Sequence, residues 1–302
     1  MSRKRKGNPV NGWVILDKPA GLGSTTAVSI VKRIFNAQKA GHAGTLDPAA
    51  SGVLPIALGE ATKTIPYVTD GEKTYAFTVR FGRATDTDDA EGQVIRTTDR
   101  IPSADEIRAV LPLFSGEIDQ VPPKYSAVHI NGQRAYDLAR ENKEVTLSAR
   151  RIRIDDLQML HFFKDGTAEF QVRCSKGTYV RSLARDMAEK LGSLGHVTAL
   201  RRLKCAKFSD QNAFSLEYLR SIEHSSNWTG VLLPVETVLD DIPALAVTQA
   251  QAFKLSNGNF LPVSDFGFVP DADVFQAKSD NRLIALVRVL DGMIRPVRLI
   301  VQ

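Results

Sequence analysis

Alternating and helical patterns of hydrophobic residues divide the first part of the chain into strands and helices. "KTYAFTVRF" predicts a strand whose buried side carries four large residues, Tyr75, Phe77, Val79 and Phe81. "GWVILDKP" predicts an earlier strand, which Pro19 ends. From Ser24 onward, apolar residues recur at helical spacing, at Ala27, Ile30, Val31, Ile34 and Phe35. A strand and a helix therefore precede the glycine-rich stretch "GHAGTLDPAASG" at residues 41–52.

The middle of the chain continues with both kinds of element. "SADE" is a capping box, in which Ser103 caps a helix and Glu106 reaches back to the backbone. "YSAVHINGQRAYDLAR" predicts a strand, an Asn-Gly turn and a short helix. After the alternating stretch "AEFQVRCS", a helix ending at Gly192 carries Arg181 and Arg185 one turn apart, away from its apolar face.

The last sixty residues have a different texture. Short strands follow "LLPVETVLDDIPAL", and the chain closes with "RLIALVRVL", an Asp291-Gly292 turn and "MIRPVRLIV", which predict a hairpin. We place a domain boundary near Asp240, with one domain over residues 1–240 and a small β domain over 241–302. Because strands and helices do not alternate strictly, an α+β fold with a mostly antiparallel sheet and flanking helices is favoured over a doubly wound parallel sheet.

The charge of the chain indicates what kind of partner it binds. The 302 residues carry a net charge of +5, with a pI near 9.2, and basic residues cluster in "SRKRK", "KRIFNAQK", "SARRIRI" and "LRRLKCAK". An anionic partner is indicated, nucleic acid first, with a solvated basic surface as the plain alternative. No run of about 18 apolar residues and no signal peptide is present, so no membrane partner is expected and the expected location is the cytoplasm.

Several classes of chemistry have no support in the sequence. The motifs for nucleotide, dinucleotide, zinc-protease and serine-hydrolase sites are absent. Cys174 and Cys205 fit neither a disulfide framework nor zinc spacing and are expected to be buried thiols. The acidic stretch "TDTDDAEGQ" superficially resembles a magnesium or calcium site but lacks the calcium-loop pattern, and its composition is also typical of a solvated loop. No metal ion is therefore expected.

One carboxylate is placed in an unusual setting. Asp47 precedes Pro48, which favours an extended backbone, and Gly41, Gly44 and Gly52 let the chain turn closely around it. A rigidly held carboxylate in a cleft and a simple turn aspartate both fit this local pattern.

Five ordered segments resolve this choice by resemblance. "GHAGTLDP", "KTYAF", "CSKGTYVRS" and "HVTALRRL", together with "PPKYSAVHINGQRAYDLAR", resemble the TruB family of tRNA pseudouridine synthases, and the likeness covers residues 11–220. The resemblance implies the pseudouridine synthase fold, a reaction without cofactor, and tRNA as the partner, with the uridine at position 55 of the T-loop as the target. Residues after Asp240 match poorly, and their similarity to a small RNA-binding domain of the PUA type depends on position and the closing hairpin.

The same resemblance assigns roles to particular residues. It implies that Asp47 is the catalytic aspartate, that Tyr75 packs on the target uracil, and that Arg181 pairs with the aspartate. Positions that touch the flipped nucleotide or shape its pocket are His42, Tyr179 and Leu200. Two lysines are expected near the RNA or the pocket wall, Lys18 and Lys63. Ala43 stands where the family often carries threonine. This difference does not affect any proposed reacting atom.

The implied reaction needs few chemical groups. Pseudouridine formation moves the ribose C1′ bond from uracil N1 to C5, so one carboxylate acting as nucleophile or base is sufficient, and the sequence does not choose between them. Arg181 would keep a buried aspartate ionised, whereas Arg185 is expected on the surface or facing RNA. Without the resemblance, the local sequence fits Tyr75 as an ordinary core tyrosine and His42 as an ordinary turn histidine. A base buried in an RNA loop must also flip out.

Two other function classes stay open at this stage. A non-catalytic tRNA-binding protein or RNA chaperone would explain the basic stretches and the terminal β domain. A metal-dependent phosphodiesterase would use Asp86, Asp88 and Asp89. The free protein is expected to be a monomer.

Overall fold

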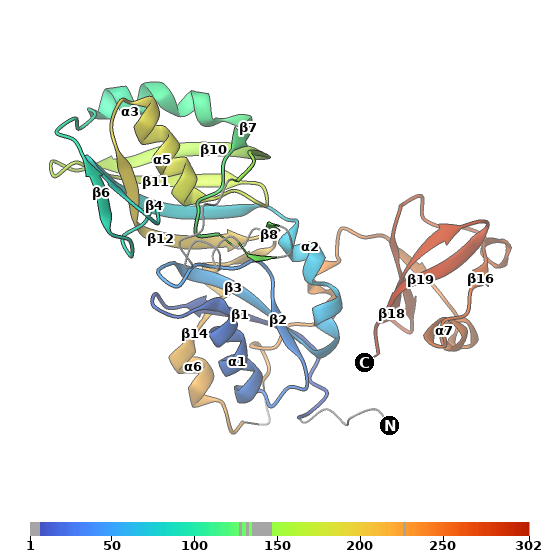
Figure 1. The fold of residues 1–302 in the computed structure, drawn as a ribbon. Helices are drawn as coiled ribbons and strands as arrows, with labels where there is room; N and C mark the ends of the chain where they lie inside the picture. Colours follow the sequence, from blue (N-terminus) through green and yellow to red (C-terminus); the bar gives the residue numbers. More distant parts are fainter. Residues whose placement is uncertain (1–6, 127–128, 131–132, 135–146, 226–227, 302) are drawn as a thin grey trace.

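A ten-stranded sheet forms the centre of the molecule in the computed structural model, which describes residues 7–126, 129–130, 133–134, 147–225 and 228–301 (Figure 1). Its main path runs β14-β1-β3-β12-β4-β11-β10-β7, with β2 beside β3 and β13 beside β12. Most neighbours are antiparallel, and β1–β14 and β3–β12 are parallel, so the predicted α+β class is confirmed. The strands are β1 (Gly12–Lys18), β2 (Ala40–His42), β3 (Ser51–Leu58), β4 (Lys73–Phe81), β7 (Gly116–Gln120), β10 (Arg150–Phe162), β11 (Thr167–Cys174), β12 (Gly195–Cys205), β13 (Phe208–Ser209) and β14 (Phe214–Ser215).

Strand β12 joins the two halves of this sheet. It lies between β3 and β4, which are consecutive in the sequence, and places Arg202 opposite Tyr75 of β4. Gly52, at the start of β3, has φ +101°, and a Cβ atom there would lie 2.2 Å from the Arg202 carbonyl oxygen. Only glycine allows the two strands to approach this closely, so the pairing of β3 with β12 depends on the glycine at position 52.

Helices cover one face of the sheet and form two hydrophobic cores with it. They are α1 (Ser24–Ile34), α3 (Ala104–Val110) with its extension η2 (Leu111–Phe114), and α5 (Val180–Lys190). The predicted capping box of Ser103 and Glu106 begins α3, and Gly192, with φ +66°, follows the end of α5. Tyr75 and Leu200 contact both cores, and thus mark the seam between them.

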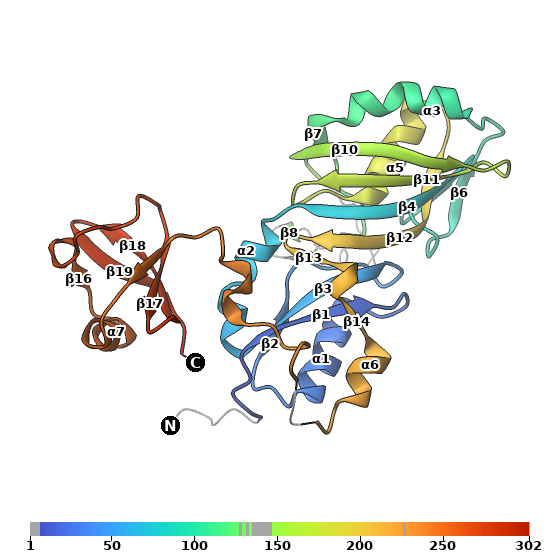
Figure 2. The ribbon, with the colours of Figure 1, turned by 180° about the vertical axis from the view of Figure 1, so that it is seen from behind.

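The other face is covered only in part. Figure 2 shows β4, β10, β11 and β12 from behind, with α5 beyond them and no helix in front. Next to β1 and β3, a third core includes Trp13, Ile15 and Val68. This core also takes residues from η1 (Gly59–Lys63), α2 (Ile65–Thr69) and η4 (Val235–Val238). α6 (Leu216–Ser221) lies beside α1 and contributes Leu219 to the core of that helix, and η3 (Asp210–Asn212) follows β13.

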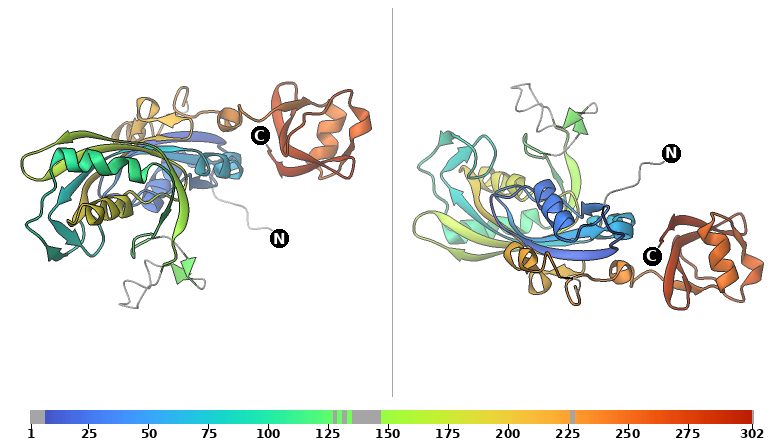
Figure 3. Two further views of the ribbon diagram at one scale, coloured as in Figure 1. Left: turned by 90° about the horizontal axis from the view of Figure 1, so that it is seen from above. Right: turned by 90° about the horizontal axis from the view of Figure 1, so that it is seen from below.

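A second, five-stranded sheet lies at one end of the molecule, beside α2 (Figures 1 and 3). Its order is β15-β17-β18-β19-β16, and it has its own hydrophobic core. The elements are β15 (Ala244–Ala246), α7 (Gln249–Ser256), β16 (Leu261–Pro262), η5 (Val263–Asp265), β17 (Phe275–Ser279), β18 (Arg282–Leu290) and β19 (Met293–Leu299). The small C-terminal β domain and its closing hairpin are confirmed.

Smaller features complete the picture. β5 (Arg83–Thr85) pairs with β6 (Val94–Thr97), and β8 (His129–Ile130) pairs with β9 (Gln133–Arg134). The predicted turn at Asn131-Gly132 and the short helix after Arg134 lie outside the described residues. Both cysteines are free and buried, as expected. Among the described residues, no helix is both long and apolar enough to cross a membrane.

Candidate active site

The loop that carries Asp47 connects β2 to β3 and is fixed at several points. Its backbone turns at Pro48, where the amide of Ala50 donates to the Asp47 carbonyl over 3.1 Å. Ser24, the first residue of α1, accepts from the Leu46 amide at 2.9 Å and donates to the Leu46 carbonyl at 2.8 Å. The aspartate therefore follows a residue whose two backbone polar groups are both held by a buried hydroxyl.

Lys18 supports the same loop from behind. It is fully buried, and its ammonium donates to the carbonyl oxygens of Leu22 at 2.7 Å, Pro19 at 3.0 Å and Pro48 at 3.2 Å. Burial lowers the pKa of Lys18 to about 8, and the nearby Asp47 opposes this decrease. The predicted lysine is thus next to the aspartate loop rather than on the pocket wall.

Arg181, in the first turn of α5, joins two carboxylates. Its Nη2 lies 2.9 Å from Oδ2 of Asp47, and its Nη1 lies 3.5 Å from Oδ2 of Asp89. The guanidinium also donates to the carbonyls of Thr87 at 3.0 Å and Tyr125 at 2.9 Å. With 6% of its side chain exposed, the arginine is held on both sides and has little freedom to leave Asp47.

The acidic stretch at residues 86–91 supplies partners for arginines. Asp89 accepts from the Thr87 hydroxyl at 2.5 Å and the Glu91 amide at 3.1 Å, which fixes its carboxylate toward Arg181. Asp88 pairs with Nη1 of Arg185 at 3.0 Å. Arg185, expected on the surface or facing RNA, is partly exposed, and Asp88, Asp186 and the Val121 carbonyl bind its guanidinium.

Tyr179 is the residue that precedes α5. Gln120, at the end of β7, accepts from the Tyr179 amide at 2.8 Å and donates to its carbonyl at 3.1 Å. Gln120 is 2% exposed, so this pair of hydrogen bonds is shielded from water. The start of α5, and with it Arg181, is thereby tied to the edge of the sheet.

Tyr75, Leu200 and Arg202 form the wall opposite α5. Arg202 is 1% exposed; it donates through Nε to the Val53 carbonyl at 2.7 Å and through Nη2 to the Gly44 carbonyl at 3.0 Å. It also hydrogen-bonds to Tyr75, whose pKa burial raises to about 12. Tyr75 is therefore a neutral phenol at physiological pH, and Arg202 connects its strand to the aspartate loop.

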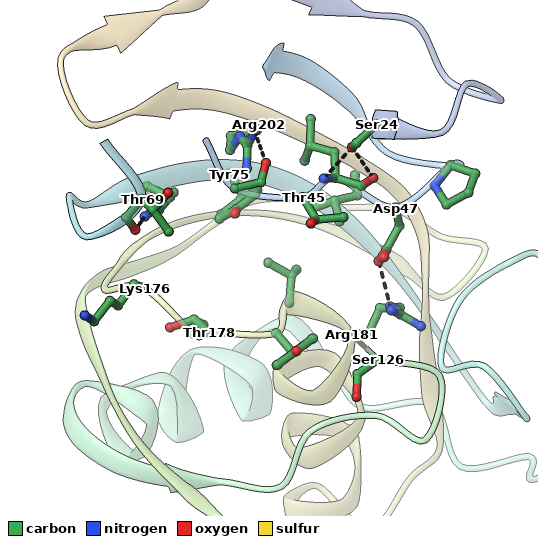
Figure 4. Close-up of a pocket in the computed structure, with 18 of the residues that line it drawn as sticks. Ser24, Thr45, Asp47, Thr69, Tyr75, Ser126, Lys176, Thr178, Arg181 and Arg202 are labelled. Carbon is green, nitrogen blue, oxygen red and sulfur yellow. Dashed lines mark hydrogen bonds and ion pairs between the residues drawn. The ribbon is translucent and has the colours of Figure 1, made fainter. Parts of the chain in front are cut away.

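These walls enclose a pocket of about 530 Å³, within the size range of ligand sites (Figure 4). In Figure 4 Asp47 and Arg181 meet at one side of it, joined by their ion pair, with Tyr75 on the sheet side. Five of the eight predicted residues line the pocket: Asp47, Tyr75, Tyr179, Arg181 and Leu200. The structure does not bring the other three, Lys18, His42 and Lys63, to its lining.

His42 and Lys63 have other surroundings. His42 lies on β2, where its Nδ1 is buried and has no hydrogen-bond partner among the described residues. Burial, with help from Arg202, lowers the pKa of His42 and favours the neutral ring. Lys63 Nζ contacts Glu60 Oε2 at 2.5 Å and the Leu299 carbonyl at 2.6 Å, so it connects η1 to the last strand of the C-terminal sheet.

The charge on Asp47 is balanced between opposing influences. Burial raises the pKa of Asp47, Arg181 lowers it, and Asp89 raises it again, with a net upward direction. The carboxylate is nevertheless open to the pocket, since 37% of the side chain remains exposed. Arg181 thus opposes the cost of burying this charge, as its pairing with an ionised acid requires.

Several residues of the site were not predicted from the sequence. Asp89 stands in the acidic stretch that was weighed as a metal site, and its pairing with Arg181 depends on a contact 92 positions away. Arg202, Gln120 and Ser24 were not singled out, because each acts through a backbone group that is distant in the sequence and is brought near it by the fold. Among the described residues, no three His, Cys, Asp or Glu side chains converge as metal ligands.

Comparisons with known proteins identify the family of this chain. The family model described as "TruB family pseudouridylate synthase (N terminal domain)" matches residues 32–180, and "tRNA pseudouridylate synthase B C-terminal domain" matches residues 181–240. A protein named tRNA pseudouridine synthase B from Caulobacter sp. (strain K31) is 48% identical over 99% of this chain and 98% of its own length. The protein of that name from Rhodospirillum rubrum is 47% identical, over 99% of both chains.

Solved structures show the same fold at lower identity. A chain in the crystal structure of a Cbf5–Nop10–Gar1 complex gives a TM-score of 0.72 at 24% identity, covering 96% of this chain and 85% of that one. A chain of an archaeal box H/ACA Nop10–Cbf5 complex gives a TM-score of 0.72 at 23% identity, covering 100% and 93%. From the family matches and the full-length relatives together, the chain belongs to the TruB family of pseudouridylate synthases.

Proposed function

We propose that the protein isomerises uridine to pseudouridine in tRNA, at the uridine at position 55 of the T-loop. The observation that carries this proposal is the pair formed by Asp47 and Arg181 at 2.9 Å, open to a pocket whose other wall is Tyr75. The relatives named tRNA pseudouridine synthase B support tRNA as the substrate. The choice of position 55 follows from the resemblance of the motifs.

The reaction needs a nucleotide that has left its RNA stack. A base inside a folded loop cannot reach a carboxylate in a pocket, and flipping it out costs a few kcal/mol. Tyr75 and Leu200, both on the pocket wall, offer apolar surface on which the uracil can pack. The net charge of +5 supports the phosphate contacts that hold the RNA without selecting a base.

Asp47 then acts on the ribose. In one route its carboxylate attacks C1′ as the C1′–N1 bond breaks, and the resulting ester bond between Asp47 and C1′ breaks when C5 of the turned base bonds to C1′. In the other route the carboxylate removes the C2′ proton as the C1′–N1 bond breaks and returns it to C2′ when C5 bonds to C1′. The C5 proton leaves to water and N1 gains one, so the atoms balance without an added reactant. No cofactor is required by this scheme. Arg181 keeps Asp47 ionised, and Asp89 holds Arg181 in place.

We also propose that residue 240 separates the catalytic domain from the C-terminal β domain, which would contact RNA outside the pocket. The second sheet starts at Ala244 and has its own core, which supports a boundary there. We further expect a monomer in the cytoplasm.

The decisive experiment measures tritium release from a T-loop RNA labelled at uracil C5. The normal protein should release tritium to water, and Asp47→Asn should reduce the rate at least about 10²-fold, because the reacting carboxylate is lost. RNA affinity should stay the same, since Asp47 is not proposed to bind phosphate.

The same substitution at an exposed acid provides the control. Asp105→Asn on α3, where 95% of the side chain is exposed, should leave the rate unchanged. Absence of tritium release from the normal protein, with RNA still bound, would favour a non-catalytic RNA-binding protein. A rate abolished by EDTA would favour the metal-dependent alternative instead.

A further inference from the structure

The pocket contains more positive than negative charge. One carboxylate, Asp47, lines it together with four cations, Lys73, Lys176, Arg181 and Arg202. Lys176 pairs with Asp70 at 2.9 Å, and Arg181 pairs with two acids. Within the described part of the chain, Lys73 and Arg202 have no carboxylate within 4.0 Å and donate to backbone carbonyls.

These two cations border Tyr75. Lys73 is two residues before Tyr75 on β4 and therefore lies on the same face of the strand. Arg202 lies on the neighbouring strand β12, directly opposite Tyr75. Lys73 is 5% exposed and Arg202 is 1% exposed. The positive charge thus lies beneath the pocket, next to the ring proposed to pack on the uracil, rather than at the mouth where phosphates stay.

The ammonium of Lys73 has donor capacity left over. It donates to the carbonyls of Thr69 and Gly71, both from the turn after α2. An ammonium group has three N–H donors, so one remains for a ligand. Burial lowers the pKa of Lys73, and Arg202 acts in the same direction, whereas Cys205, Cys174 and Asp70 oppose the decrease. The cation has thus lost water, and none of these acidic groups contacts it. Such a group is preorganised for negative charge that develops during a reaction.

The proposed reaction creates such a charge. Uridine is neutral, but when the C1′–N1 bond breaks, the electron pair leaves with the base and spreads over N1, O2 and O4 of the uracil. We propose that Lys73 is a catalytic residue whose ammonium stabilises the detached uracil anion, with Arg202 adding positive charge from the neighbouring strand. The anion is consumed when C5 bonds to C1′. This assignment rests on the proposed function, which does not itself require Lys73.

A comparison of two RNAs tests the assignment. One carries uridine at the target position and the other 5-fluorouridine, whose electron-withdrawing fluorine makes its uracil anion more stable and less dependent on a cation. Consumption of the target nucleotide is measured in single turnovers at saturating protein, by digestion and chromatography. Lys73→Met should slow uridine about 10²-fold and 5-fluorouridine about tenfold or less, because one preorganised donor is lost. Lys73→Arg, which keeps the charge, should keep the ratio of the two rates near that of the normal protein.

The ratio is measured within one protein preparation, so a partly unfolded variant does not change it. Lys176→Met is the matched control, since it removes another cation of the pocket, but a solvent-exposed one paired with Asp70, and it should affect both RNAs equally. An equal loss on both RNAs for Lys73→Met, or a rate within twofold of normal, would overturn the role of Lys73 while leaving the proposed function in place. Failure of the normal protein to convert either RNA would overturn the proposed function itself.

Discussion

Arg181 faces two acids, of which only Asp47 opens to the pocket. The second, Asp89, is buried and fixed by Thr87 and the Glu91 amide, so it acts on the arginine and not on a substrate. It also raises the pKa of Asp47, whereas Arg181 lowers it. The reactivity of one carboxylate is thus set by two neighbours of opposite charge.

Substitution of each neighbour should move the pH dependence in opposite directions. Arg181→Gln removes the cation that favours ionised Asp47, so the acid limb of the single-turnover rate should shift to higher pH, with a lower maximum. Asp89→Asn removes a repelling charge and should shift that limb to lower pH. Arg185→Gln, one turn along α5 and paired with Asp88, should leave it in place. Shifts of the same sign for both variants would contradict this account of the pKa of Asp47.

At the scale of elements, the start of α1 doubles as an anchor for the catalytic loop. Ser24 is buried, and its hydroxyl satisfies both polar backbone groups of Leu46, the residue before Asp47. The N-cap residue of α1 is Gly23, which has no side chain to accept from the first helix amides, and Ser24 is the first residue of the helix itself. The hydroxyl is used by the loop instead.

Ser24→Ala should therefore cost both stability and rate. Two buried backbone groups lose their partner, which destabilises the fold by about 1–3 kcal/mol, and the looser loop should slow catalysis with little change in RNA affinity. Ser29→Ala is the control on the same helix, because Ser29 is exposed and donates only to the Thr25 carbonyl. Urea unfolding and single-turnover rates check this. Equal stability of the two variants would show that the hydroxyl of Ser24 is not needed.

The elements themselves were largely predictable, and the contacts between them were not. β4 follows the alternation of "KTYAFTVRF", and α3 begins at its predicted capping box, because both depend on neighbours along the chain. The role of Asp89 depends on Arg181, and that of Arg202 on Gly44, residues 92 and 158 positions apart. Such pairs depend on how distant segments pack against one another in the folded chain, and no local pattern contains that information. Lys63 does not line the pocket for the same reason, since its partner is the distant Leu299 carbonyl.

At the scale of the whole molecule, a small set of contacts joins the two sheets. Leu283, Leu286 and Ile300 pack into the third core of the larger sheet. Glu60 Oε2 accepts from Lys63 at 2.5 Å and from the Val301 amide at 2.9 Å. η1, which carries both side chains, leads directly into α2 and the start of β4, so the C-terminal domain is attached next to the pocket wall.

Weakening of this attachment should speed amide hydrogen exchange in the last residues of the chain. Lys63→Met removes the cation between Glu60 and the Leu299 carbonyl, at a cost of roughly 1 kcal/mol for a partly exposed pair. Amide hydrogen exchange over residues 294–301 should then become about fivefold faster, which corresponds to that energy. Lys254→Met, at an exposed lysine of α7, should leave exchange unchanged. Unchanged exchange in Lys63→Met would mean that the apolar contacts alone hold the domain.

The insertion of β12 between β3 and β4 has a consequence for biosynthesis. Because β3 and β4 each pair with β12 and not with one another, their facing edges lack this strand until residue 205 has left the ribosome. Asp47 is made some 130 residues before Arg181, yet the two meet only after this late strand is added. The nascent chain therefore spends much of its synthesis with open strand edges, and we expect the risk of wrong strand pairing to be greatest before β12 emerges.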